Sequence, residues 1–146
     1  MIAYSRQTIS NADINVVKKV LKSDFLTQGP ETKKFEFNLK KRFKSKYAVS
    51  VNSASSALHL ACLAMNIKKN DIVWTVPNTY AASANCALLL GAKIDFVDID
   101  IKTFNISIIE LEKKLIEAKK RNKLPKLLIV VHFAGLPCDL KSLNKL

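Results

Sequence analysis

Glycine is scarce in this sequence, which has three glycines among 146 residues. The loops that cradle the phosphates of dinucleotides and nucleoside triphosphates need several glycines at short, fixed spacing, and no such spacing occurs here. Histidine is scarcer still, with two residues, and the three cysteines, Cys62, Cys86 and Cys138, are scattered among apolar neighbours. No Ser-His-Asp or Cys-His arrangement and no zinc-binding spacing is present, so we expect reduced, packed thiols and no metal.

Long apolar segments are also missing. No run reaches the length that spans a membrane, and the first residues have no apolar signal core. We therefore expect a cytoplasmic protein without a membrane partner. The hydrophobic share of 49% and the charged share of 25% are those of a globular domain with a real core.

Arginine is rare although the chain is strongly basic, with a formal net charge of +12. Only three of the 24 basic residues are arginine, and the lysines are spread over most polar segments. Nucleic-acid sites usually cluster their charge and interleave arginines or aromatics. This pattern favours a solvated lysine-rich surface over a nucleic-acid site, although the excess charge could attract an anionic ligand.

From residue 47 onward, apolar strands alternate with helices. The pattern predicts strands at 47–51, 72–76, 93–97 and 127–131, helices at 55–65, 80–90 and 107–121, and a last helix from Asp139. Such alternation indicates an α/β fold with a mainly parallel sheet flanked by helices on both faces. Ligands bind such sheets at the carboxyl ends of the strands.

The first 46 residues do not follow this alternation and predict a helical arm. A capping box at Ser10 opens one helix, which continues through Lys22. Gly29 and Pro30 open a second helix. Its stripe of Phe35, Leu39 and Phe43 has the spacing of residues that pack into a core. We expect a division into an arm with a loop at 1–46 and a sheet domain at 47–146.

The turn between the first predicted strand and its helix contains Asn52 and the serines Ser53, Ser55 and Ser56. The N-terminus of a helix presents free backbone N–H groups and the positive end of the helix dipole, which together bind phosphate. The alternative is that these serines merely cap the helix. On local pattern alone, capping is favoured.

Other residues at the expected strand ends have two interpretations each. Tyr80 could stack on a planar ligand or be a core aromatic. His132 stands at a strand end, whereas His59 lies one turn into a helix and is expected to pack near the core. Asp98 and Asp100 could bind a metal, but turn capping is the favoured interpretation.

Five segments, at 25–30, 47–59, 77–85, 96–100 and 131–139, together resemble the DegT/DnrJ/StrS nucleotide-sugar aminotransferases. The resemblance implies pyridoxal 5′-phosphate (PLP) as cofactor and the large domain of the fold-type I aminotransferases. The segment around Tyr4, Leu26–Gly29 and the serine turn are most similar to the subfamily of pseudaminic acid synthesis. That subfamily aminates carbon 4 of a UDP-linked 4-keto-6-deoxy-N-acetylhexosamine, with glutamate as amino donor.

The resemblance also implies roles for individual residues. Ser55 and Ser56 would hold the PLP phosphate, and Tyr80 would stack on the pyridine ring. The family usually has Gly-Thr where this chain has Ala54-Ser55, which keeps the hydroxyl. The nucleotide-sugar would contact Tyr4, Leu26, Thr27, Gln28, Gly29 and Ser56. A homodimer with shared active sites is implied as well.

The family's catalytic lysine and the aspartate that pairs with the pyridine nitrogen match no position in this sequence. We therefore expect an incomplete N-terminal part of the large domain, with no catalytic residue of its own and no transaminase activity alone. Two alternatives stay open from the sequence. One is a relative of the same fold that lacks the lysine, and the other is a non-catalytic basic α/β module that binds a nucleotide.

Overall fold

A computed structural model of the chain describes residues 6–146. The chain forms two compact units, one that ends at Ser50 and one that comprises Val51–Leu146. Tyr4, which we expected to contact the sugar, lies outside the described residues. Among the helices that the structure describes, none is both long enough and apolar enough to cross a membrane.

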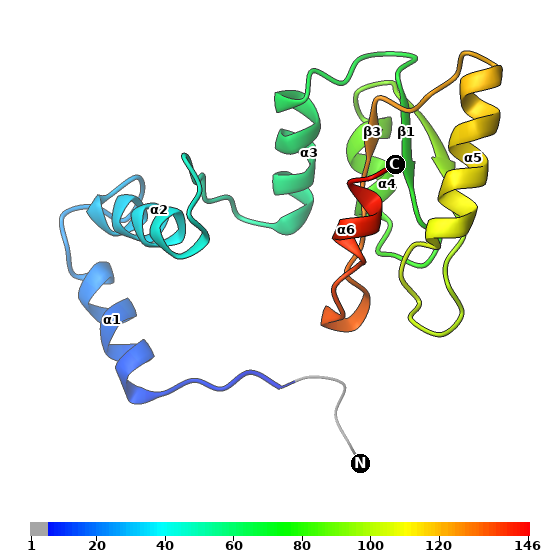
Figure 1. Cartoon of the computed structure of the whole chain (residues 1–146). Helices are drawn as coiled ribbons and strands as arrows, with labels where there is room; N and C mark the ends of the chain where they lie inside the picture. Colours follow the sequence, from blue (N-terminus) through cyan, green and yellow to red (C-terminus); the bar gives the residue numbers. More distant parts are fainter. Residues whose placement is uncertain (1–5) are drawn as a thin grey trace. The chain divides into compact units, whose positions relative to one another are not determined.

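The second unit is built on a parallel sheet of three strands in the order β2-β1-β3 (Figure 1). The strands are β1 (Ile72–Thr75), β2 (Lys93–Phe96) and β3 (Leu127–Leu128). Trp74 of β1 lies opposite Asp95 of β2 and Leu128 of β3. α4 (Ala82–Leu88) connects β1 to β2, and α5 (Ile108–Lys120) connects β2 to β3. α3 (Ala54–Ala64) precedes β1, whereas a short 3-10 turn η1 (Phe133–Gly135) and α6 (Leu140–Leu143) follow β3.

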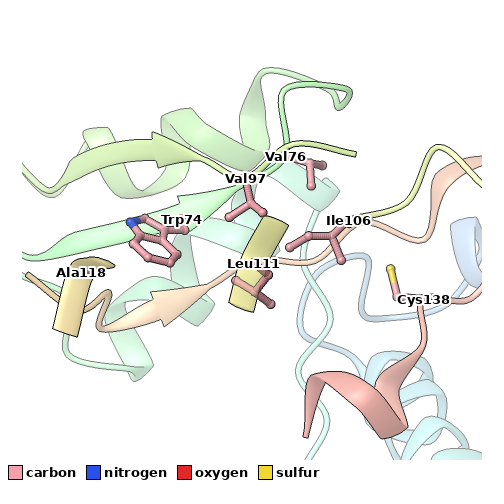
Figure 2. Packing of buried hydrophobic residues seen from close by; sticks show 7 residues of the cluster. All are labelled: Trp74, Val76, Val97, Ile106, Leu111, Ala118 and Cys138. Carbon is pink, nitrogen blue, oxygen red and sulfur yellow. The ribbon is translucent and has the colours of Figure 1, made fainter. Parts of the chain in front are cut away.

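Helices cover both faces of this sheet. Successive residues of β1 point to opposite faces, so neighbouring residues pack against different helices. Val73 packs against Cys62 of α3 and Cys86 of α4. Its neighbour Trp74 packs on the other face with Leu111 of α5, in the cluster that Figure 2 shows. The predicted α/β architecture is confirmed.

The strand predicted at 47–51 is wrong, since these residues form no strand. Strand pairing needs a neighbour, and no described strand pairs with this segment. Ser50 instead donates from its backbone N–H and its hydroxyl to Glu36, at 2.8 and 2.9 Å. Both bonds lower the pKa of the Glu36 carboxyl below its ordinary value, and the bond from the backbone N–H is the larger cause.

The first unit contains α1 (Asn11–Leu21) and α2 (Pro30–Phe43). The predicted capping box is present, because Ser10 accepts from the Asp13 N–H and Asp13 accepts from the Ser10 N–H. Neither helix has a buried residue. The predicted core packing of the aromatic stripe is therefore wrong: Phe35 is 56% and Phe43 73% exposed, because this two-helix unit encloses no core that could bury them.

The three cysteines are buried and free, as predicted. The sulfurs of Cys62 and Cys86 lie 3.7 Å apart between α3 and α4. Burial, followed by the contact with Cys86, raises the pKa of the Cys62 thiol to about 11. Burial also raises the pKa of Cys138. Cys62 and Cys138 are therefore packing residues with little thiolate at neutral pH.

Lys126, just before β3, holds the turn that precedes β1 in place through hydrogen bonds. Its ammonium group bonds to the Asp71 carboxylate at 2.7 Å and to the carbonyl of Asn66. Two hydrogen bonds lower the pKa of Asp71 below its ordinary value of 3.8: the bond from Lys126 is the larger cause, and the bond from the backbone N–H of Lys68 is the next. The ionised carboxylate therefore stabilises the fold above that value, and this stabilisation is lost as the pH falls through the lowered pKa of the folded state.

We expect Asp71→Asn to lower the urea midpoint at pH 7 and to have a smaller effect at acid pH below 3.8. Urea unfolding followed by the fluorescence of Trp74, the single tryptophan of the chain, measures both midpoints. Asp24→Asn is the control, since Asp24 accepts no side-chain hydrogen bond in the part of the chain that the structure describes. An equal loss at both pH values would contradict the linkage.

Candidate functional site

The turn before α3 is a capped helix start, as the alternative interpretation predicted. Ser53 is the N-cap and accepts from the backbone N–H of Ser56 at 3.2 Å. The Ser56 hydroxyl donates to Asn52 Oδ1 at 2.8 Å and lies 3.0 Å from the Ser53 hydroxyl. The side chains of Ser53 and Ser56 are therefore engaged within the turn.

Ser55 is placed differently. Within residues 6–146 its hydroxyl makes no hydrogen bond, and the backbone N–H groups of Ala54 and Ser55 have no acceptor. Both residues are exposed. Capping and anion binding therefore do not exclude each other here, because the cap uses Ser53 and Ser56 and leaves three donors free beside the positive end of the α3 dipole.

Tyr80 lies next to these donors. Ser55 and Tyr80 line one pocket of about 300 Å³, together with Ala81, Ala82, Asn85, Cys86 and Leu89. Tyr80 is 80% exposed, so it is not a core aromatic. The helix begins at Ala82 and not at Tyr80 as predicted, because Tyr80 is in the turn whose carbonyl accepts from Ser83 at 2.9 Å. The ring is thus a free planar surface beside a cluster of donors.

Asn85 and Leu89 also line this pocket, and the sequence analysis did not identify them. They follow Ala81 at intervals of four residues, which places them on the same face of α4. This helical spacing, counted from the segment of Tyr80 and Ala81, is the pattern in the sequence that could have identified Asn85 and Leu89. Asn85 adds an amide, the one polar side chain besides Ser55 and Tyr80 in the lining.

The two histidines have different surroundings. His59 is half-buried, and its Nδ1 lies 3.2 Å from the carbonyl oxygen of Cys86, which confirms its expected place near the core. His132 is exposed, and its Nδ1 accepts from the backbone N–H of Cys138 at 3.0 Å. Neither histidine joins a metal-binding cluster among residues 6–146.

Asp98 and Asp100 order the loop after β2, as predicted. Asp98 accepts from the N–H of Ile99 at 2.7 Å. Asp100 accepts from the N–H groups of Lys102 and Thr103, both at 2.9 Å. Both bonds lower the pKa of Asp100 below its ordinary value, and the bond from Thr103 is the larger cause.

The expected sugar-binding loop at 26–29 belongs to the first unit. Gln28 has φ +52°, and Gly29 is the N-cap of α2. A Cβ on Gly29 would lie 2.9 Å from the Cβ of Phe25, so this close turn requires glycine. Leu26 and Gly29 line a pocket of about 280 Å³ between α1 and α2, whereas Thr27 and Gln28 do not line it.

A larger cavity of about 550 Å³ lies beside α5 and touches neither Ser55 nor Tyr80. Lys114 lies in its wall, 2.7 Å from the Asp95 carboxylate and 5.0 Å from the centroid of the Trp74 ring. Acidic and basic side chains are equally numerous in the lining, so the cavity favours no charged ligand. The Ser55–Tyr80 pocket is the better candidate site.

Comparisons with known proteins agree with this fold. Residues 7–146 match the model of the DegT/DnrJ/EryC1/StrS aminotransferase family. The UDP-4-amino-4,6-dideoxy-N-acetyl-beta-L-altrosamine transaminase of Campylobacter jejuni (serotype O:2) is 39% identical over 146 residues, which are 100% of this chain and 38% of that protein.

Solved structures agree as well. Spr1654 of Streptococcus pneumoniae, in its PLP form, matches with a TM-score of 0.86 and 32% identity over 99% of this chain and 35% of that one. PseC of Helicobacter pylori, an aminotransferase involved in the biosynthesis of pseudoaminic acid, matches with a TM-score of 0.84 and 31% identity over 98% and 37%. The chain thus spans little more than a third of these proteins. It belongs to the DegT/DnrJ/EryC1/StrS aminotransferase family.

Proposed function

We propose that this chain is the cofactor-binding first part of a PLP-dependent nucleotide-sugar aminotransferase, with an N-terminal arm at 1–46 and the start of the large domain at 47–146. The observation that carries the proposal is the Ser55–Tyr80 pocket. It joins free hydrogen-bond donors at a helix N-terminus to an exposed aromatic ring. The family membership and the PLP form of a structural relative support the cofactor.

The residues present fit PLP. Its phosphate needs several donors, which the Ser55 hydroxyl and the N–H groups of Ala54 and Ser55 supply without breaking any bond of the cap. Its pyridine ring needs a flat apolar surface, which Tyr80 offers. Ser56 keeps the turn in shape through Asn52 and Ser53, and its hydroxyl would be a further contact to the phosphate or the sugar.

PLP, when bound, supplies the electron sink that allows an amino group to leave one carbon and join another. This chain's own residues bind the phosphate, orient the ring through Tyr80 and keep the turn rigid through Ser53. No lysine of the chain matches the family's catalytic position. We infer that the 146 residues bind the cofactor but do not carry out transamination alone.

The substrate assignment rests on the similarity to the altrosamine transaminase of Campylobacter jejuni. We infer a UDP-linked 4-keto-6-deoxy sugar as amino acceptor, glutamate as donor, and a role in the synthesis of a sugar of the pseudaminic acid type. Tyr4 and Leu26–Gly29 would contact the nucleotide-sugar in a cytoplasmic homodimer of the whole enzyme.

The test is binding of pyridoxamine 5′-phosphate, measured by isothermal titration calorimetry on the 146-residue chain. This form of the cofactor has no aldehyde, so it does not react with the many surface lysines. We expect Ser55→Ala to weaken binding about tenfold or more, because it removes a hydrogen bond to a charged group. We expect Tyr80→Ala to weaken it about tenfold through the lost stacking.

Two matched variants separate binding from folding. Ser53→Ala removes the cap and is expected to cost about 1 kcal/mol of stability, whereas Ser55→Ala should leave the melting temperature unchanged. Tyr47→Ala removes another exposed tyrosine, 73% exposed and in the first unit, and should bind as the unchanged chain does. Equal affinities of Ser55→Ala, Tyr80→Ala and Tyr47→Ala would rule out the proposed site.

A further inference from the structure

The loop that follows β3, at residues 132–138, is held rigidly although most of it is exposed. Asn105, which is 5% exposed, reaches it from the chain before α5. The Asn105 amide donates to the carbonyls of Leu136 and Pro137 at 3.0 and 3.3 Å, and its oxygen accepts from the N–H of Phe133 at 2.9 Å. A loop fixed by a buried side chain can hold a functional group in place.

His132 is the first residue of this loop, and one of its ring nitrogens is already committed. The backbone N–H of Cys138 donates to Nδ1 at 3.0 Å, so Nδ1 carries no proton. The proton of the neutral ring is therefore on Nε2. In the part of the chain that the structure describes, Nε2 makes no hydrogen bond, and the side chain is exposed. The ring is anchored at one end and presents a donor at the other.

The strand register brings this donor to the edge that carries the pocket. Trp74 of β1 lies opposite Leu128 of β3, and Ile129 donates to the Trp74 carbonyl at 2.8 Å. β3 ends at Leu128, four residues before His132, and β1 ends at Thr75, five residues before Tyr80. Neighbouring strands lie about 4.8 Å apart. His132 and Tyr80 thus follow adjacent strands at the same carboxyl edge.

We propose that His132 is a further ligand-binding residue of this site, whose Nε2–H donates to an oxygen of the phosphate-bearing aromatic ligand held by Ser55 and Tyr80. This inference rests on the proposed function. The Cys138 N–H and the Asn105 amide act as positioning groups, since they fix the ring and the loop without reaching the ligand.

Two isosteric substitutions separate the two nitrogens. In His132→Asn the amide oxygen replaces Nδ1 and still accepts from Cys138, but the distal donor is lost. In His132→Gln the amide nitrogen reaches the place of Nε2, but the bond to Cys138 is lost. We expect His132→Asn to keep the melting temperature and to bind pyridoxamine 5′-phosphate about tenfold more weakly. We expect His132→Gln to recover most of the affinity even if its melting temperature falls.

The reverse order of affinities, or affinities that follow only the melting temperatures, would show a purely structural histidine and overturn the inference. Nitrogen NMR of the unchanged chain gives a second readout, independent of folding in the variants. It should show the Nε2–H tautomer of His132 and a change in that signal when the ligand is added. A signal that does not respond, in a chain whose binding is still sensitive to Ser55→Ala, overturns this inference alone, whereas no binding by the unchanged chain contradicts the proposed function as well.

Discussion

Leu111→Ala is expected to lower the free energy of unfolding by about 2–5 kcal/mol, the range for a leucine removed from a closed core. Leu111 is 2% exposed and lies on the inner face of α5. It packs in one cluster with Trp74, Val97 and Ile106, as Figure 2 shows. This cluster holds α5 to the sheet, so the cavity left by alanine would weaken the contact between helix and strands directly.

Urea unfolding followed by Trp74 fluorescence measures this loss, since the only tryptophan of the chain lies in the same cluster. Ile109→Ala is the matched control. It removes a similar aliphatic side chain from the same helix, but Ile109 is 66% exposed, so its loss should stay within about 0.5 kcal/mol. Comparable losses in the two variants would mean that α5 does not pack on the sheet through Leu111.

The strands and helices that the sequence predicts best are those with partners close in the chain. β1, α4, β2 and α5 follow one another directly, and each was predicted to within a few residues. The segment at 47–51 has the same apolar character as β1, yet it forms no strand. Apolar character makes a strand possible, but only a neighbouring strand supplies the hydrogen bonds of the ladder.

The aromatic stripe of α2 shows the same limit of a local pattern. The spacing of Phe35, Leu39 and Phe43 correctly predicts a helix, because periodicity reports the backbone. It does not report what covers the helix. In the described chain Phe35 and Phe43 are exposed, since α1 and α2 alone are too few elements to enclose them.

The candidate site also has a part that the sequence predicts and a part that only the structure shows. Tyr80 follows β1, so the rule on strand ends places it at the carboxyl edge of the sheet without the structure. The rule does not place Ser55, because no strand precedes α3; the structure brings Ser55 to the pocket that Tyr80 lines. The free state of the Ser55 hydroxyl could not be predicted, because it depends on Ser53 and Asn52 engaging Ser56. The role of Asn105 was also out of reach, since its partners lie 28 to 32 residues further along the chain.

Asn105→Ala is expected to lower the free energy of unfolding by about 2–4 kcal/mol, because it removes three part-buried hydrogen bonds that one side chain makes to the loop. The side chain of Asn105 satisfies the N–H of Phe133 and the carbonyls of Leu136 and Pro137. Alanine can replace none of these bonds. Amide hydrogen exchange at Phe133 should accelerate more than at residues of β1, because the loop opens before the sheet does.

Asn105→Asp distinguishes the two halves of this amide. An aspartate oxygen still accepts from the Phe133 N–H, but the second oxygen replaces the donor and faces two carbonyl oxygens, which repel it. The carboxylate is also buried at this position, where the uncharged amide is tolerated and a charge is not. Asn105→Asp should therefore destabilise the chain at neutral pH at least as much as Asn105→Ala does. Asn144→Ala, at an exposed asparagine after α6, is the control. Equal stability of Asn105→Ala and Asn144→Ala would show that the loop holds its shape without Asn105, and it would remove the positioning argument for His132.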